Sequence, residues 1–271
     1  MADLINTHFI NKTNKELNTK IDELWECILG VGGFKKFEGA GTYTFNIPPG
    51  LETIYVSAIG AGGGGGGGGG AYRPTADNTN FRNGGAGGGG GGRGEYLLDQ
   101  IISVTPRETL TVIVGGKGTG GDPGLDGEAG TWEGQNPGNG ADGTDGTATI
   151  LKRGGTVLLS VSPGTRGSGG TKGKDTKSSS LGGTGGVIDG TDGGANTKYA
   201  SSDQGYAKPG EGGSGGTIEI FSRYGNGGSG GKGGLGNSQI YAKAGADGED
   251  GALVICFGNY RFEAITWDVV E

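Results

Sequence analysis

Few residues of this 271-residue chain are of the types that catalyse reactions, and their spacing does not assemble a site. His8 is the single histidine and precedes the first expected helix, which disfavours a Ser-His-Asp, Cys-His or histidine-metal site. Each Gly-Lys pair lacks the Ser or Thr that must follow it in a phosphate-binding P-loop. We therefore expect no enzyme, no cofactor and no metal.

Aspartates in Asp-Gly pairs are the remaining candidates for chemistry. Asp142, Asp145, Asp247 and Asp250 each precede a glycine, a pattern typical of turns, where the carboxylate bonds to nearby backbone. Calcium binding is the alternative, because carboxylate oxygens suit that ion. Paired carboxylates could also hydrolyse glycans, but no pattern places two of them at one cleft. We interpret the four aspartates as turn residues that add solubility.

The composition excludes several classes of protein. Glycine makes up 70 residues, and the net charge is −7 with the basic residues scattered along the chain, which argues against nucleic-acid and anionic-membrane partners. No apolar run approaches the ~18 residues of a membrane span, and no signal peptide is expected at the start. Cys27 and Cys256 are expected to be free thiols, with a disulfide as the alternative.

Short runs rich in β-branched and aromatic residues interrupt the glycine. Such runs are typical of strands, and together they predict a mainly β fold with a small antiparallel β-sandwich. The expected strands are 42–47, 53–59, 95–104, 108–114, 147–151, 156–161, 252–257 and 260–267.

The glycine segments between these strands have a period of three residues. Residues 181–187 read X-G-G, and residues 140–146 read G-X-X. Three residues per turn is the period of an extended left-handed helix without internal hydrogen bonds. Several such helices packed together could bond to one another, with glycine wherever a face meets a neighbour. Glycine content then ranks segments by depth, and the nine-glycine run 62–70 is enclosed on all sides. A flexible glycine linker is the alternative.

One pattern resembles a known family: GAGTYTFNIPPGLETIYVSAIGAGGGGGGGGG, followed by GRGEYLLDQIISVTPRETLTVIVGGKG. It resembles the glycine-rich domains of bacteriophage fibre proteins and is similar to the glycine-rich domain of anaplastic-lymphoma-kinase-type receptors. Over residues 34–257 the resemblance implies a β-sandwich carrying an inserted bundle of polyglycine II helices. It further implies a virion protein, assembled in the host cytoplasm, whose loops contact a host receptor as in the tail-fibre tip adhesins of T-even-like phages.

The amino-terminal segment has heptad spacing. We divide the chain into a helical oligomerisation or attachment segment, 1–32, and a glycine-rich domain, 33–271. A homotrimer follows from the family resemblance, a dimer is possible, and a helix docked on its own sandwich is the alternative. Other virion fibre or baseplate proteins are expected partners of this segment. The heptad seam consists of Ile10, Asn14, Leu17, Ile21, Leu24 and Ile28.

Aromatic and arginine residues in the connecting loops are the candidates for receptor binding, because these types dominate binding hot spots. The alternative is that each ring caps the open end of the bundle. We expect the 72–83 loop at the distal end, but successive connections should alternate between the two ends, so that not all candidates share one tip. They are Tyr72, Arg73, Phe81, Arg82, Trp132, Tyr199, Tyr206, Phe221, Arg223 and Tyr224.

The expected function is host attachment through an outer-membrane protein or a surface polysaccharide. A structural head, neck or collar fibre is the second reading, and an ice-binding protein is the third. Against ice binding, the outward residues mix charged and aliphatic types and form no regular threonine array.

Overall fold

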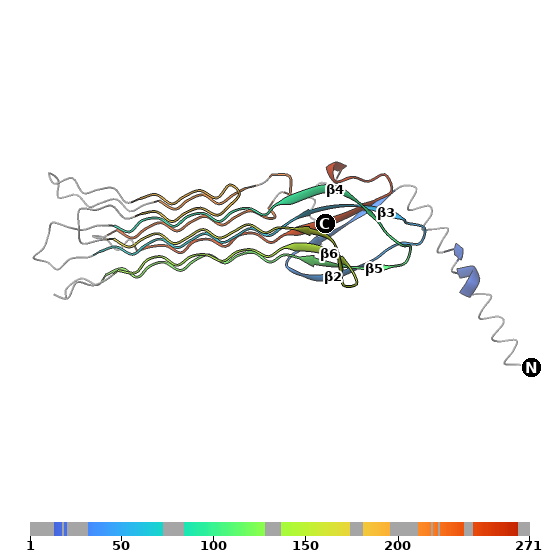
Figure 1. The fold of residues 1–271 in the computed structure, drawn as a ribbon, viewed down its shortest axis with the longest axis horizontal. Helices are drawn as coiled ribbons and strands as arrows, with labels where there is room; N and C mark the ends of the chain where they lie inside the picture. The colour runs from blue at the N-terminus through green and yellow to red at the C-terminus, as the bar shows by residue number, and fades with distance from the viewer. Residues whose placement is uncertain are drawn as a thin grey trace, which may run out of the picture.

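A long glycine-rich bundle extends from one end of two stacked β-sheets (Figure 1). The structure is a computed structural model. No helix among the residues it describes is long and apolar enough to cross a membrane. The described residues are 14–17, 19–20, 32–72, 84–127, 137–173, 181–195, 211–217, 219–221, 223–235 and 241–264.

The two sheets are antiparallel, with the strand orders β1-β8-β3-β4 and β2-β5-β6-β7. The mainly β sandwich predicted from the sequence is confirmed. The strands are β1 (Gly33–Glu38), β2 (Gly41–Asn46), β3 (Thr53–Ile59), β4 (Tyr96–Ser103), β5 (Thr109–Val114), β6 (Thr149–Arg153), β7 (Thr156–Val161) and β8 (Ala252–Phe257).

Alternating side chains build the core between the sheets. In β5, Leu110 and Val112 are fully buried while the threonines beside them are partly or fully exposed. Ile54 and Val56 of β3 meet them from the opposite sheet. Since about 25 cal/mol is gained per Å² of apolar surface removed from water, this core is the main hydrophobic contribution to the stability of the fold.

A second apolar cluster covers the outer face of the first sheet, which explains why all six residues of β8 are buried. Phe221 and Phe262 lie in this cluster with ring centroids 4.6 Å apart. Cys256 of β8 is also buried there as a free thiol, and burial raises its pKa to about 11. Cys27 lies outside the described residues.

The predicted strand at 260–267 is wrong over the part that the structure describes. Phe262–Ala264 form a short 3-10 helix instead. The backbone N–H of Phe262 donates to Asp99 Oδ1 at 3.1 Å, and its ring fills the second cluster. β1 forms one edge of the first sheet and was not predicted, because its GFKKFE sequence with two lysines gave no strand signal.

The amino-terminal heptad is tested only in small part. Residues 14–17 and 19–20 are helical and exposed, and Leu17 is 56% exposed. Ile10, Ile21, Leu24 and Ile28 lie outside the described residues. The coiled coil therefore stays a prediction.

Candidate functional site

The glycine-rich bundle consists, over the described residues, of ten extended segments. Six of them continue directly from or into a strand of the sandwich: A follows β3, B precedes β4, C follows β5, D precedes β6, E follows β7 and J precedes β8. We name the segments in chain order: A (60–72), B (84–94), C (115–127), D (137–148), E (162–173), F (181–187), G (190–195), H (211–217), I (225–235) and J (241–251).

Segment A is hydrogen-bonded to six neighbours. The N–H groups of Gly63, Gly64 and Gly65 donate in turn to carbonyls of segments B, D and J, each at 2.9 Å. The carbonyls of the same three glycines accept from segments I, E and C. The pattern repeats every three residues along the segment, so the buried backbone groups of its successive glycines are paired without a helix or a sheet ladder.

Segment B is enclosed in the same way. Its N–H groups donate to segments E, G and I, and its carbonyls accept from segments A, F and H. The other eight segments form a closed ring around A and B, in the order C-D-E-F-G-H-I-J. Residues 60–71 and 84–92 are all buried, so the two longest glycine runs are the two enclosed segments. The expected enclosure of the nine-glycine run is therefore confirmed. The finer ranking is not, because segments F and H, which read X-G-G, bond to three segments each, as do D and J, which read G-X-X.

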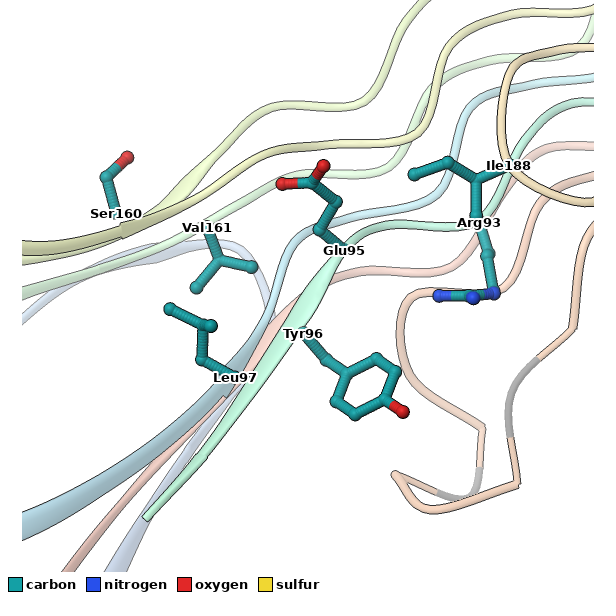
Figure 2. A pocket seen from close by; sticks show the side chains of 7 residues that line it. All are labelled: Arg93, Glu95, Tyr96, Leu97, Ser160, Val161 and Ile188. Carbon is teal, nitrogen blue, oxygen red and sulfur yellow. The ribbon is translucent and has the colours of Figure 1, made fainter. Parts of the chain in front are cut away.

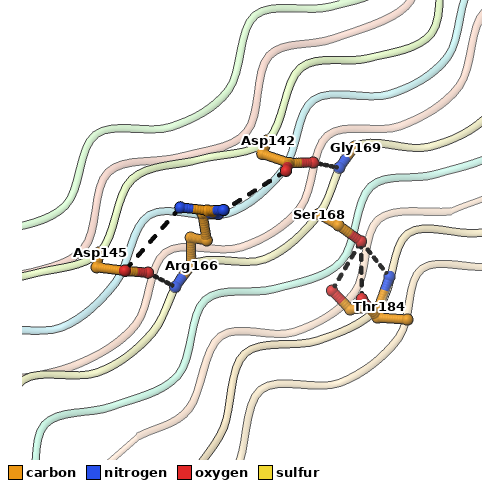
Figure 3. Close-up of polar contacts among 6 residues, drawn as sticks. All are labelled: Asp142, Asp145, Arg166, Ser168, Gly169 and Thr184. Carbon is orange, nitrogen blue, oxygen red and sulfur yellow. Dashed lines mark hydrogen bonds and ion pairs between the residues drawn. The ribbon is translucent and has the colours of Figure 1, made fainter.

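Ring segments face solvent on one side and use side chains to complete the bonding. On segment D, Asp145 Oδ1 accepts from the N–H of Arg166 at 2.8 Å, and Asp142 Oδ1 accepts from the N–H of Gly169 at 2.9 Å (Figure 3). On the other side of the same segment, Thr144 Oγ1 accepts from a backbone N–H of segment C at 2.7 Å. Since the carbonyl of Thr144 also accepts from the N–H of Gly64, the triplet Gly143-Thr144-Asp145 bonds to three neighbouring segments, A, C and E.

The interpretation of the Asp-Gly pairs as turns is wrong. Asp247 and Asp250 lie on extended segment J and accept from backbone N–H groups of segment C at 2.9 and 3.0 Å. The Gly120 N–H first, and then the Lys117 ammonium, hold the pKa of Asp247 below its ordinary value. These carboxylates are occupied by backbone donors, and among the described residues no cluster of His, Cys, Asp or Glu could hold a metal ion.

Five stretches of chain leave the described bundle at the end away from the sandwich, which we call the distal end. They are 73–83, 128–136, 174–180, 196–210 and 236–240. Hydrogen bonds place their flanking residues at one level, since Gly70 donates to Gly138 at 2.9 Å and accepts from Gly173 at 2.8 Å. Successive connections alternate between the two ends, as expected, because the intervening ones run through the sandwich or turn back beside it.

The candidate receptor-binding residues divide between the two ends. Tyr72 is half-buried at the distal end of segment A. Phe221, Arg223 and Tyr224 lie at the opposite end, where Phe221 is fully buried and Arg223 Nη2 donates to the Tyr224 hydroxyl at 3.3 Å. The structure does not bring these three together with the others. Outside the described residues, but in stretches that leave at the distal end, lie Arg73, Phe81, Arg82, Trp132, Tyr199 and Tyr206.

Three exposed apolar residues near the distal end were not predicted. Leu125, Leu181 and Tyr241 are 81%, 69% and 59% exposed. Each is a large side chain among glycines and small or polar residues, close to a connecting stretch, and that local contrast is the sequence signal that could have identified them.

A groove of about 350 Å³ lies where β4 and β7 pass into the bundle (Figure 2). Arg93 supplies its cation, but its Nε is 2.6 Å from Asp189 Oδ2 and its guanidinium lies 5.7 Å from the centre of the Tyr96 ring. The remaining lining is Glu95, Leu97, Ser160, Val161 and Ile188. The contacts of Arg93 join β4 to segment B and to the neighbouring Asp189. The residues that line the groove include no nucleophile paired with a base.

No protein-family model matches the chain, and no curated protein matches its sequence.

Proposed function

We propose that the chain is a subunit of a bacteriophage fibre or adhesin that binds a receptor on the host surface. The observation that carries the proposal is that five connecting stretches leave the bundle at one end. The two central segments of the bundle offer almost no side chains for binding: apart from glycine they contain only isolated alanines, with Tyr72 at the end of A and Arg93 near the end of B. Binding residues are commonly found on loops held by a rigid scaffold.

The ten segments are best understood as polyglycine II helices. Their printed backbone hydrogen bonds run between segments and repeat every three residues. An extended helix with three residues per turn has this property, because its backbone groups point sideways. Such a bundle is stiff without an apolar core, which suits a support that must hold loops away from a particle.

Recognition by the flanks of the bundle is disfavoured by their bonding. Polar side chains on the ring segments already accept from neighbouring backbone, as Asp192 Oδ1 does from the N–H of Gly185 at 2.8 Å. Others form ion pairs, including Lys117 with Asp247 at 3.1 Å. The stretches at the distal end carry the aromatic and arginine types that dominate binding energy at protein surfaces.

Attachment to the particle is assigned to residues 1–32. In the register of the first sheet, Gly33 pairs with Phe257, whereas Ala252 at the other end of β8 adjoins segment J. The chain therefore enters the sandwich at the end opposite the bundle. A coiled coil of residues 1–32, trimeric or dimeric, would join copies of the chain or a larger fibre there, and leave the distal end free.

Binding to intact cells tests the proposal. The purified, fluorescently tagged chain is titrated onto a panel of intact Gram-negative bacteria, and the expected result is saturable binding to particular strains and competition with phage adsorption to them. The matched control has residues 73–83 replaced by a Gly-Ser stretch of equal length, which preserves the bundle. Absence of saturable binding by a folded chain would instead support a structural head, neck or collar fibre.

A further inference from the structure

The two sheets of the sandwich have their edge strands on the same two sides of the molecule. β1 and β2 are the edge strands on one side, and β4 and β7, which contact each other, are those on the opposite side. A groove of about 590 Å³ lies between β1 and β2, and the groove of about 350 Å³ lies between β4 and β7. Edge strands are the parts of a sheet that another chain can reach, so these two sides are the surfaces of the sandwich where a partner can pack.

The well-exposed apolar side chains of the strands all lie on edge strands. Phe34 of β1 is 42% exposed and Ile101 of β4 is 71% exposed. Leu97 of β4 and Val157 of β7 complete the group, and the central strands β3, β5, β6 and β8, which the structure describes throughout, contribute none to it. Single exposed apolar residues are common on protein surfaces, so the alignment of these residues decides whether they form an interface.

Strand register places Phe34 and Ile101 at the two ends of one row across the first sheet. Phe34 pairs with Cys256 of β8, which also pairs with Tyr55 of β3. Tyr55 in turn pairs with Ile101. Residues directly opposite one another in antiparallel strands share a face of the sheet, so the two exposed side chains lie on the outer face at one level. A second copy, rotated about a lengthwise axis, keeps this level and brings its Ile101 against Phe34.

A second row on the core face of the same sheet ends at the two grooves. Phe37 pairs with Leu253, which also pairs with Ala58, and Ala58 pairs with Leu97. Phe37 lines the groove between β1 and β2, whereas Leu97 lines the groove between β4 and β7 (Figure 2). The rotation that brings Ile101 to Phe34 therefore also brings Leu97 of one copy to the larger groove of the next.

Charge and edge chemistry suit a contact through side chains. β1 has Lys35 and Lys36, and the β4 side has Glu95 and Asp99. The N–H of Asp99 donates to Ser57 Oγ at 2.8 Å, and Ser57 lies in the same row as Lys36, so opposite charges lie at one level. The lysines of β1 and the bulge between β3 and β4 oppose backbone pairing with another chain, so two copies would not continue as one sheet.

We infer that copies of the chain pack side by side, with the β1 side of each sandwich against the β4 side of the next. Leu97 fills the groove between β1 and β2 of the neighbour, and Ile101 packs on its Phe34. Because the two sides are opposite one another, such contacts close only in a ring of at least three copies, which agrees with a trimer and not with a dimer. The inference rests on the joining of copies by residues 1–32 in the proposed function, which would hold the sandwiches at a high effective concentration, and not on receptor binding.

Disulfide cross-linking of the full chain tests the contact. Phe34→Cys and Ile101→Cys are combined with Cys27→Ser, which leaves the buried Cys256 as the single native thiol. Within one copy the two new thiols are three strand spacings apart, about 14 Å, whereas a disulfide requires Cα atoms within about 7 Å. A bond between them must therefore join two copies. Mild oxidation should convert the oligomer into covalent dimers and trimers, whereas either single variant should stay unlinked.

Two matched controls make the test specific. Phe34→Cys combined with Leu125→Cys, an exposed position on segment C, should not cross-link. Leu97→Ser, added to the Phe34→Cys and Ile101→Cys pair, should reduce the linked fraction because the neighbour's groove loses the side chain that fills it, whereas Leu181→Ser should leave that fraction unchanged. Melting under reducing conditions checks that each variant is folded.

Three results would overturn the interface. They are an unlinked double variant in a chain that sediments as an oligomer, a parent chain that sediments as a monomer or dimer, and a linked fraction that Leu97→Ser leaves unchanged. Cross-linking of a single variant to itself would overturn the β1-to-β4 contact in favour of like edges meeting. Binding to bacteria is measured separately, so the failure of this interface and the failure of host attachment are distinguishable.

Discussion

A single methyl group in the middle of the bundle should destabilise the protein strongly. A Cβ added to Gly66 of segment A would overlap the carbonyl of Ser168 and lie 2.7 Å from the nitrogen of Gly169, both on segment E. Carbon atoms need about 3.5–4.0 Å from such neighbours. Segment E must therefore move away by about an ångström, which disturbs the bonds of 2.9 and 2.8 Å that Gly167 and Gly170 donate to segment A.

The magnitude follows from those bonds. Two buried hydrogen bonds weakened or lost cost about 1–3 kcal/mol each when a group is left without a partner. Restricting the unfolded chain by Gly→Ala offsets about 0.4–1 kcal/mol of this. We expect Gly66→Ala to lower the free energy of unfolding by about 3 kcal/mol, or the Tm by about 6–12 °C for a domain of this size.

Equilibrium urea unfolding and calorimetry measure this change. The matched control is Gly155→Ala in the β6–β7 turn, where nothing lies within 4 Å of the added Cβ and φ is not positive. That variant should equal the parent or exceed it by up to about 1 kcal/mol. If Gly66→Ala melted within about 2 °C of Gly155→Ala, close packing of the central glycines would be refuted.

Three further predictions concern polar contacts and assembly. Asp145→Ala removes the acceptor for the N–H of Arg166 and should lower the free energy of unfolding, measured in urea, by about 1 kcal/mol. Asp145→Asn keeps an acceptor oxygen and should lower it less. Equal losses of stability in the two variants would contradict the role of that oxygen. Glu108 accepts two hydrogen bonds from Arg153, each at 2.8 Å, which chiefly lower its pKa. The ion pair of Glu108 therefore stabilises the fold fully above the ordinary pKa of a glutamate, and this contribution is lost as pH falls through the lowered pKa. Glu108→Gln should consequently make Tm fall less steeply as the pH is lowered into the acid range. An unchanged slope of Tm against pH would exclude this contribution of Glu108. Deletion of residues 1–31 should convert an oligomer into a folded monomer, as measured by analytical ultracentrifugation; an unchanged mass would place the oligomer interface elsewhere.

Sequence patterns predicted the parts of the fold that depend on local residue types. Runs of β-branched and apolar residues identified β2 to β8, because each of these strands buries at least one face in a core. The nine-glycine run identified segment A, because a segment with six neighbours has little room for side chains. These inferences depend only on the relation between a residue's type and the burial of its own position.

Errors arose where the outcome depends on partners distant in the chain. β1 pairs with β8, which lies more than two hundred residues later in the chain, and the two lysines of β1 are not typical of a strand, so that this strand was not predicted. Asp-Gly pairs form turns in many proteins, but here Asp142 and Asp250 meet N–H groups on neighbouring segments that local sequence does not reveal.

The direction of the hydrogen bonds in the bundle has a mechanical consequence. The segments run lengthwise from the sandwich, and their bonds cross between neighbours (Figure 1). Tension applied at the distal end, with the chain held at Gly33, would pull along the segments and load many of these bonds in shear at once. Six segments pass such a load directly into strands of the sandwich. A particle tethered through this protein could therefore withstand a larger pulling force than one held by a contact whose hydrogen bonds are loaded one after another from its edge.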